Sequence, residues 1–295
     1  MFMVISVWVS QPCMALPAEN LCLIPKAYTS LYTQDGSRLK LVASRPGKNQ
    51  NIILLPGGPG MDASYLMGLV NLLNVEGNIW LLDLPGNGNN THKNPNFNLW
   101  QKSLVKAISS LDNVILIGHS FGGCIALATP EIEPHIKALV LLDAAPRNMT
   151  ESLIQEKEKF NLPDTTPSIV NYQKNPSNKA LINMWVKWVD YYFSKSSRAE
   201  GEKLMSEVIC NHKAVDWAWV HFWPGYSVKW VPKIPTLVVS GALDHMCPFY
   251  LFEKDSRFLK NNIRMVEVKE AGHFPWVEQP RQVKNVLEAF IKSLI

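Results

Sequence analysis

The stretch NVILIGHSFGGCIAL, residues 113–127, decides the fold of this chain. It begins with the apolar run 114–117, which has the length and composition of a buried strand, and it leads into segment 121–128, which is typical of a buried helix. Between them lies G-H-S-F-G, residues 118–122, in the strand–turn–helix setting that the motif G-x-S-x-G requires for an exposed serine hydroxyl. Ser120 is therefore the candidate nucleophile.

Strand-like and helix-like segments alternate along most of the chain. Their order predicts an α/β fold, a mostly parallel central sheet with helices on both faces. The turn QDGSR separates two segments that predict a leading antiparallel hairpin, 28–32 and 39–44. The runs that predict buried strands are 51–55, 79–82, 114–117, 138–142, 236–240 and 264–268, and the helical segments are 61–73, 99–111, 121–128, 249–259 and 282–294.

One interval, 147–233, lacks any buried-strand pattern and is rich in tryptophan and tyrosine. Aromatic residues of this kind pack helices together, and they also line apolar clefts. The interval predicts an inserted helical cap above the sheet edge, between core segments 27–146 and 234–295. The cap residues expected to bind substrate are Trp217, Trp219, His221, Phe222 and Trp223.

Composition narrows the class of protein. The chain has 295 residues, 47% of them hydrophobic and 18% charged, with a formal net charge of +4. The basic residues are scattered, so no nucleic-acid partner is expected. The five cysteines form no C-x-x-C pair and no zinc-like spacing, which predicts free thiols and neither a metal site nor a cofactor.

The first 26 residues carry an apolar stretch followed by small residues, as in a signal peptide. A signal peptide also has basic residues before its apolar stretch, whereas the first basic residue here is Lys26. This head fits an exported leader or a first strand, so the sequence leaves the compartment open between cytoplasmic and exported. No later run is long enough for a membrane-spanning helix. The oligomeric state is equally open.

A serine hydroxyl needs a base to take its proton and an acid to orient that base. Asp244 follows the strand-like run 236–240, and His273 follows the last such run, 264–268. In a parallel sheet both residues reach the same edge as Ser120. Asp143 also ends a strand and is the alternative acid, with Asp83 a weaker one, and His119 is expected to pack or hydrogen-bond locally.

Four motifs, which occur along the chain in the family's order, resemble the α/β-hydrolase fold superfamily from about residue 27 onward. They are G-H-S-F-G-G at 118–123, G-A-L-D at 241–244 with Pro248, A-G-H-F at 271–274 and D-L-P-G-N-G at 83–88. The resemblance implies Ser120 as nucleophile, His273 as general acid/base and Asp244 as the acid that orients it. It also implies a cap in the aromatic interval.

The loop LLPGGPG at 54–60 is similar to the H-G-G-P-G loop of proline iminopeptidases, with Pro56 in place of the histidine. By that resemblance the backbone N–H groups of Gly58 and Phe121 form the oxyanion hole. The expected function is a metal-independent serine hydrolase that cleaves a small, partly apolar ester or thioester through an acyl-enzyme. The alternatives are an aminopeptidase or amidase of the iminopeptidase branch and a non-catalytic ligand-binding protein.

Overall fold

A nine-stranded sheet forms the centre of the protein in a computed structural model that describes residues 3–6, 29–91 and 95–294. The strand order is β1-β2-β3-β5-β4-β6-β7-β8-β9. The strands are β1 (Met3–Ser6), β2 (Thr29–Tyr32), β3 (Arg38–Arg45), β4 (Asn51–Leu55), β5 (Gly77–Asp83), β6 (Val114–His119), β7 (Ile136–Leu142), β8 (Thr236–Gly241) and β9 (Ile263–Val268).

Strands β1, β2 and β3 pair antiparallel, β3 pairs antiparallel with β5, and the six strands from β5 to β9 in the sheet order are mutually parallel. Strands β4, β6 and β8 are buried along their whole length. This pattern is why they read as continuous apolar runs in the sequence. The predicted α/β class, the mostly parallel sheet and the leading hairpin are confirmed.

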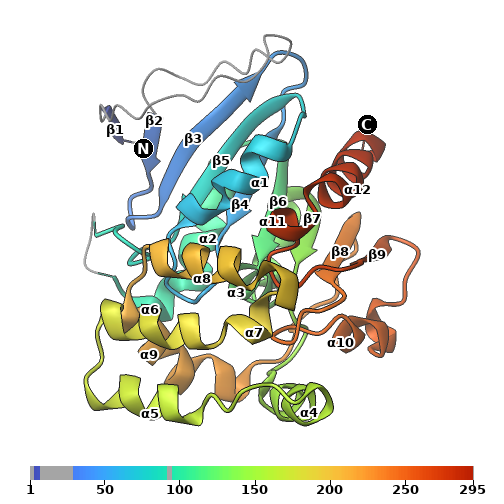
Figure 1. Cartoon of the computed structure of the whole chain (residues 1–295). Coiled ribbons are helices and arrows are strands. Elements are labelled where there is room, and N and C mark those ends of the chain that lie inside the picture. Colours follow the sequence, from blue (N-terminus) through green and yellow to red (C-terminus); the bar gives the residue numbers. More distant parts are fainter. Residues whose placement is uncertain (1–2, 7–28, 92–94, 295) are drawn as a thin grey trace.

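Helices cover both faces of the sheet (Figure 1). Helix α1 (Met67–Leu72) contacts α11 (Pro275–Glu278) and α12 (Pro280–Ser293), whereas α2 (Trp100–Ile108) contacts α3 (Phe121–Leu127). The predicted helix 249–259 is divided into α10 (Tyr250–Glu253) and the 3-10 turn η6 (Ser256–Phe258). The division occurs because the Asp255 side chain accepts from the Arg257 N–H and starts a new turn.

The predicted helix 61–73 also begins differently. Asp62 caps the 3-10 turn η1 (Ala63–Leu66) by accepting from the Ser64 N–H at 2.7 Å, and α1 follows directly. A second 3-10 turn, η2 (Phe97–Leu99), precedes α2, and η3 (Pro130–His135) precedes β7. These short turns shorten the regular helices without changing their order.

The chain between β7 and β8 is helical and lies at one end of the sheet (Figure 1). We call it the helical insertion. It consists of α4 (Thr150–Phe160), α5 (Thr166–Lys174), α6 (Asn178–Lys187), α7 (Val189–Tyr192), η4 (Lys195–Ser197), α8 (Arg198–Glu207), α9 (His212–His221) and η5 (Trp223–Gly225). The bridge Met61–Cys210 ties it to the core, and the bridge Arg147–Ser227 joins its two ends.

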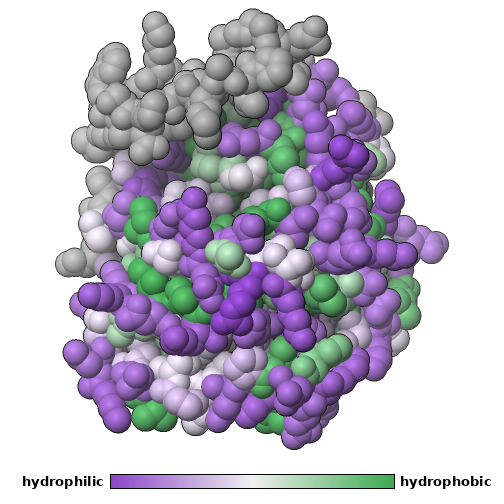
Figure 2. Space-filling view, in the orientation of Figure 1, coloured by the Kyte–Doolittle hydropathy of each residue, from purple (hydrophilic) through white to green (hydrophobic). Residues whose placement is uncertain are grey.

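Most of the leader-like segment 1–26 lies outside the described residues, apart from β1, which adds a strand to the sheet edge beside β2. Cys124, Cys210 and Cys247 are free thiols, while Cys13 and Cys22 lie outside the described residues. Over the described residues no helix is long and apolar enough to cross a membrane. In Figure 2 hydrophilic residues predominate on this face and hydrophobic ones lie in separate groups among them.

Candidate active site

Ser120 sits at the turn between β6 and α3, where its backbone has φ 52° and ψ −122°. This region is costly for a residue with a side chain, on the order of 1–3 kcal/mol, and such strain concentrates at functional sites. The turn is held by Ser120 N–H, which donates to Leu142 O at 2.9 Å, and by Ser120 O, which accepts from Gly123 N–H. A Cβ at Gly122 would lie 2.4 Å from Leu55 O, so only glycine fits beneath β4.

His273 and Asp244 form a buried pair beside Ser120. His273 Nδ1 lies 2.8 Å from Asp244 Oδ2. Asp244 Oδ1 accepts from the backbone N–H groups of Met246 and Cys247 at 2.8 and 2.9 Å, which fixes the carboxylate. Since the carboxylate accepts, His273 Nδ1 carries the proton and Nε2 is left as the basic nitrogen. The arrangement is that of an oriented general base.

The loop after β4, residues 56–60, passes directly over the serine, and we call it the oxyanion loop because the sequence predicts the oxyanion donor Gly58 in it. A Cβ at Gly57 would lie 2.7 Å from Ser120 Cβ, and Gly58 has φ +116°, so glycine is required at both positions. Among the described residues, the Gly58 N–H donates to no protein acceptor. Phe121 is the first residue of α3, and such a residue has no acceptor within its own helix. Both N–H groups are free to meet a negative oxygen.

Asp143, the alternative acid, is fully buried one strand away from Asp244. Its Oδ1 accepts from the Gly241 N–H at 2.8 Å, and its Oδ2 makes no hydrogen bond of normal geometry with the described residues. Burial, with the nearby charge of Asp244, raises the pKa of Asp143 well above its ordinary value. The structure pairs His273 with Asp244 and leaves Asp143 as a buried acid with a raised pKa.

Asp83, the weaker alternative acid, lies in a separate network, and so does His245. Asp83 Oδ1 accepts from the Ala63 N–H, and its Oδ2 pairs with Arg38 at 2.7 Å, so it anchors β3 and η1. Burial raises the pKa of Asp83 to about 6. His245, which follows Asp244 in the chain, lies 2.6 Å from Glu156 of α4 and contacts the helical insertion.

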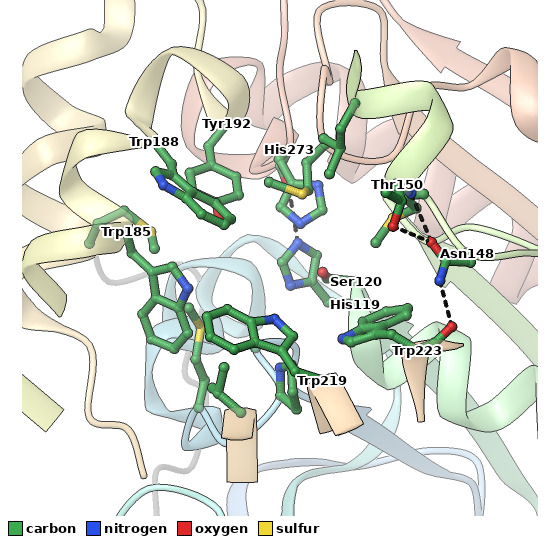
Figure 3. Close-up of a pocket in the computed structure, with 18 of the residues that line it drawn as sticks. His119, Ser120, Asn148, Thr150, Trp185, Trp188, Tyr192, Trp219, Trp223 and His273 are labelled. Carbon is green, nitrogen blue, oxygen red and sulfur yellow. Dashed lines mark hydrogen bonds between the residues drawn. The ribbon is translucent and has the colours of Figure 1, made fainter. Parts of the chain in front are cut away.

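A cavity of about 380 Å³ opens beside Ser120 and His273, between the sheet edge and the helical insertion. In Figure 3, Trp185, Trp188 and Tyr192 line one side, Trp219 and Trp223 another, and Asn148 and Thr150 a third. Asn148 and Thr150 hydrogen-bond each other, and Asn148 also donates to Trp223 O. Its described lining includes two histidines, His119 and His273, and no Asp, Glu, Lys or Arg. The remaining lining residues are Gly58, Pro59, Met61, His119, Met149, Leu153, Met205, Val215, Pro224, Met246 and Phe274.

The five cap residues predicted to bind substrate separate into two groups, of which only one lines the cavity. Trp219 and Trp223 line the cavity. Trp217 instead donates to Asn98 and packs on Trp100, with His221 beside it. Phe222 stacks on Tyr226 and touches Phe121 from outside the cavity lining. The cavity walls that the prediction omitted come from α6 and α7, through Trp185, Trp188 and Tyr192.

Asp244, Cys247 and His273 place possible ligand atoms within 4.8 Å of one another, the one such group found among the described residues. The Asp244 oxygens, however, already accept three hydrogen bonds from Met246, Cys247 and His273. These bonds fit Asp244 and His273 as an acid–base pair, and they leave the Asp244 oxygens already engaged.

The sequence model of the alpha/beta hydrolase fold family matches residues 50–280. The chain belongs to the alpha/beta hydrolase fold family. This α/β hydrolase is 28% identical over 280 residues to a proline iminopeptidase of Saccharolobus solfataricus. The alignment covers 84% of this chain and 86% of the relative. It is 26% identical over 268 residues to putative esterase/lipase 2 of Mycoplasma pneumoniae, covering 86% and 94%.

Among solved structures, the hydrolase is similar to a proline iminopeptidase-related protein from Thermus thermophilus. The TM-score is 0.68 at 20% identity, with 91% of this chain and 98% of the other covered. A likeness at this identity concerns the fold. The related sequences carry both esterase and peptidase names, so the choice between these activities depends on the cavity.

Sequence reasoning also missed Tyr65 of η1, which contacts the site through His119. Its hydroxyl lies 2.7 Å from His119 Nδ1 and accepts from the Gly57 N–H at 2.7 Å. His119 Nε2 lies 2.9 Å from the carbonyl oxygen of His273. His119 was expected to bond locally, yet its partners are 54 and 154 residues away. No motif in the sequence signals these contacts.

Proposed function

We propose that this hydrolase is a serine esterase that cleaves small, uncharged and partly apolar esters or thioesters through an acyl-enzyme. The observation that carries the proposal is the position of Ser120 and His273 in one cavity whose other lining side chains are apolar or uncharged. An acyl chain gains free energy by leaving water for such walls, whereas a charged group loses hydration there without a partner.

In the proposed reaction, Ser120 Oγ attacks the ester carbonyl carbon while His273 Nε2 takes the serine proton. Asp244 holds the His273 ring through Nδ1–H and stabilises the imidazolium that forms. The Gly58 and Phe121 N–H groups donate to the oxyanion. The leaving alcohol or thiol takes the proton from His273, and a water molecule, deprotonated by the same nitrogen, then hydrolyses the acyl-enzyme.

An aminopeptidase of the iminopeptidase branch is the second candidate, favoured by the name of the Saccharolobus relative. Such an enzyme binds a free ammonium group, and a buried ammonium needs a carboxylate partner. The described residues of the cavity lining include no Asp or Glu. This absence supports the ester over the aminoacyl substrate.

The test compares p-nitrophenyl esters of acetate, butyrate and octanoate with prolyl and alanyl p-nitroanilides, using the wild type and Ser120→Ala. We expect the highest kcat/KM for the butyrate or octanoate ester and turnover only with Ser120 present. A preference for the prolyl anilide would establish the aminopeptidase instead. Binding of the esters without turnover by either protein would indicate a ligand-binding protein.

A further inference from the structure

We propose that Tyr65 and His119 are positioning residues that hold the oxyanion loop and the backbone of His273 in place around Ser120. The inference rests on the proposed function, because it assigns roles within the same reaction. His119 is buried, Tyr65 is partly buried and packs against the hydrophobic core, and the two side chains form one chain of hydrogen bonds from Gly57 to His273.

The direction of this chain follows from its two ends. The carbonyl oxygen of His273 can only accept, so the His119 Nε2 that faces it at 2.9 Å carries a proton. A neutral imidazole has one N–H, which leaves Nδ1 as an acceptor. Burial, followed by the neighbouring His273, lowers the pKa of His119 well below its ordinary value, in agreement with a neutral ring.

The Tyr65 hydroxyl therefore donates to His119 Nδ1, and its oxygen accepts from the Gly57 N–H at 2.7 Å. Each hydrogen in the chain has one acceptor. An imidazolium at His119 would present a second N–H to the Tyr65 oxygen, and the hydroxyl hydrogen would lose its acceptor. The buried chain is complete only for the neutral Nε2–H tautomer.

The chain joins three segments that must be aligned for acyl transfer. Gly57 precedes Gly58, whose N–H is the proposed oxyanion donor. His119 precedes Ser120, and His273 is the proposed base. Figure 3 shows His119 next to both Ser120 and His273. Neither Tyr65 nor His119 has a hydrogen bond to the Ser120 hydroxyl or to the His273 ring nitrogens, so the two residues act through the backbone segments they hold.

The test uses three variants that cut the chain at different points. Tyr65→Phe removes the link to Gly57 but leaves the ring in place. His119→Asn keeps an acceptor for Tyr65 and loses the donor to His273 O, whereas His119→Gln keeps a donor and loses the acceptor. Tyr226→Phe is the matched control, because Tyr226 is a buried tyrosine whose hydroxyl donates to Ala145 O, outside the chain.

We expect Tyr65→Phe to lower kcat by about 10²-fold with KM within about twofold, since a small misplacement of reacting groups costs about that factor. Binding of an aryl boronic acid, which forms a tetrahedral adduct on the serine, weakens in parallel. Tyr226→Phe loses similar thermal stability and keeps its kcat. The two His119 variants also lower kcat, and ¹⁵N NMR of the wild-type ring shows the Nε2–H tautomer between pH 5 and pH 9.

Wild-type kcat in Tyr65→Phe, or an Nδ1–H tautomer or imidazolium at His119, overturns the inference. If Tyr65→Phe does not fold, the same kinetic comparison is made with His119→Asn and His119→Gln. Normal kcat in both variants overturns the inference in that case. A fully active Ser120→Ala overturns the proposed function itself, so the two failures are distinguishable.

Discussion

The carboxyl group of Asp143 is buried within electrostatic reach of Asp244, at the carboxyl ends of the adjacent parallel strands β7 and β8. Asp244 bonds His273, and Asp143 bonds the backbone of Gly241 at the end of β8. Two carboxylates so close in a buried site do not both ionise at neutral pH. Of the two acids, Asp143 is the one whose pKa is raised, and Asp244 is the one that bonds His273.

This division of roles predicts that replacing each aspartate with asparagine will have unequal effects on kcat. Asp244→Asn removes the charge that orients and stabilises the His273 ring, and we expect kcat to fall by roughly 10²–10⁴. Asp143→Asn preserves an acceptor for the Gly241 N–H and a neutral side chain, and we expect kcat within about tenfold of the wild type. Steady-state kinetics on the best ester decides the matter, and the reverse order would make Asp143 the acid.

The raised pKa of Asp143 predicts a pH-dependent stability difference. The unfolded chain ionises this group near its ordinary value of about 4, while the folded protein keeps the proton to much higher pH. Folding above that pH binds a proton, so the group destabilises the folded protein increasingly as the pH rises, until the folded pKa is reached. Asp143→Asn should therefore gain stability relative to the wild type as the pH is raised from about 4 towards neutral.

Urea denaturation of both proteins at several pH values measures this difference. A constant difference across the range would mean that Asp143 ionises in the folded protein as it does in the unfolded one.

The close packing around Gly122 predicts that Gly122→Ala, which adds one methyl group, will lower both stability and activity. A Cβ there would lie 2.4 Å from Leu55 O and 2.7 Å from Pro56 O, and both are backbone atoms that cannot rotate away. We expect Gly122→Ala to destabilise the fold by roughly 1–3 kcal/mol and to lower activity. Gly225→Ala is the control, since nothing lies within 4 Å of its Cβ position. Equal unfolding midpoints for the two variants would refute the tight contact.

The tryptophans of the insertion predict a chain-length effect on substrate binding. Trp223 lines the cavity, so Trp223→Ala should lower kcat/KM for the octanoate ester. The expected loss of transition-state stabilisation is about 1–3 kcal/mol, with a smaller loss for the acetate ester. Trp217 packs on Trp100 outside the cavity, so Trp217→Ala should lower stability without dependence on chain length. Equal losses on short and long esters in Trp223→Ala would place Trp223 in the packing of the insertion only.

The sheet was predictable because its central strands are buried on both faces. Runs such as 114–117 and 138–142 therefore contain almost no polar residue. The order of Ser120, Asp244 and His273 was predictable for a related reason, because each residue lies within a few positions after the carboxyl end of a parallel strand. Segment 249–259 was harder, since a single capping residue, Asp255, divides it.

The cavity lining was only partly predictable. Trp217 and Trp219 are two positions apart on α9, so their side chains differ by about 200° around the helix axis and face different surroundings. His221, one turn after Trp217, lies on the Trp217 side. Periodicity separates these residues, but the sequence does not say which side faces the cavity. That is decided by packing against segments more than 100 positions away, such as Asn98, 119 positions from Trp217.

The central claim is that Ser120 forms a covalent intermediate with the help of His273, and covalent labelling tests it most directly. The wild type and Ser120→Ala are treated with a fluorophosphonate, digested and mapped by mass spectrometry. We predict one adduct on the peptide containing Ser120, loss of esterase activity in proportion to labelling, and neither labelling nor turnover in Ser120→Ala. An adduct on another residue, or full ester hydrolysis by Ser120→Ala, would contradict the account.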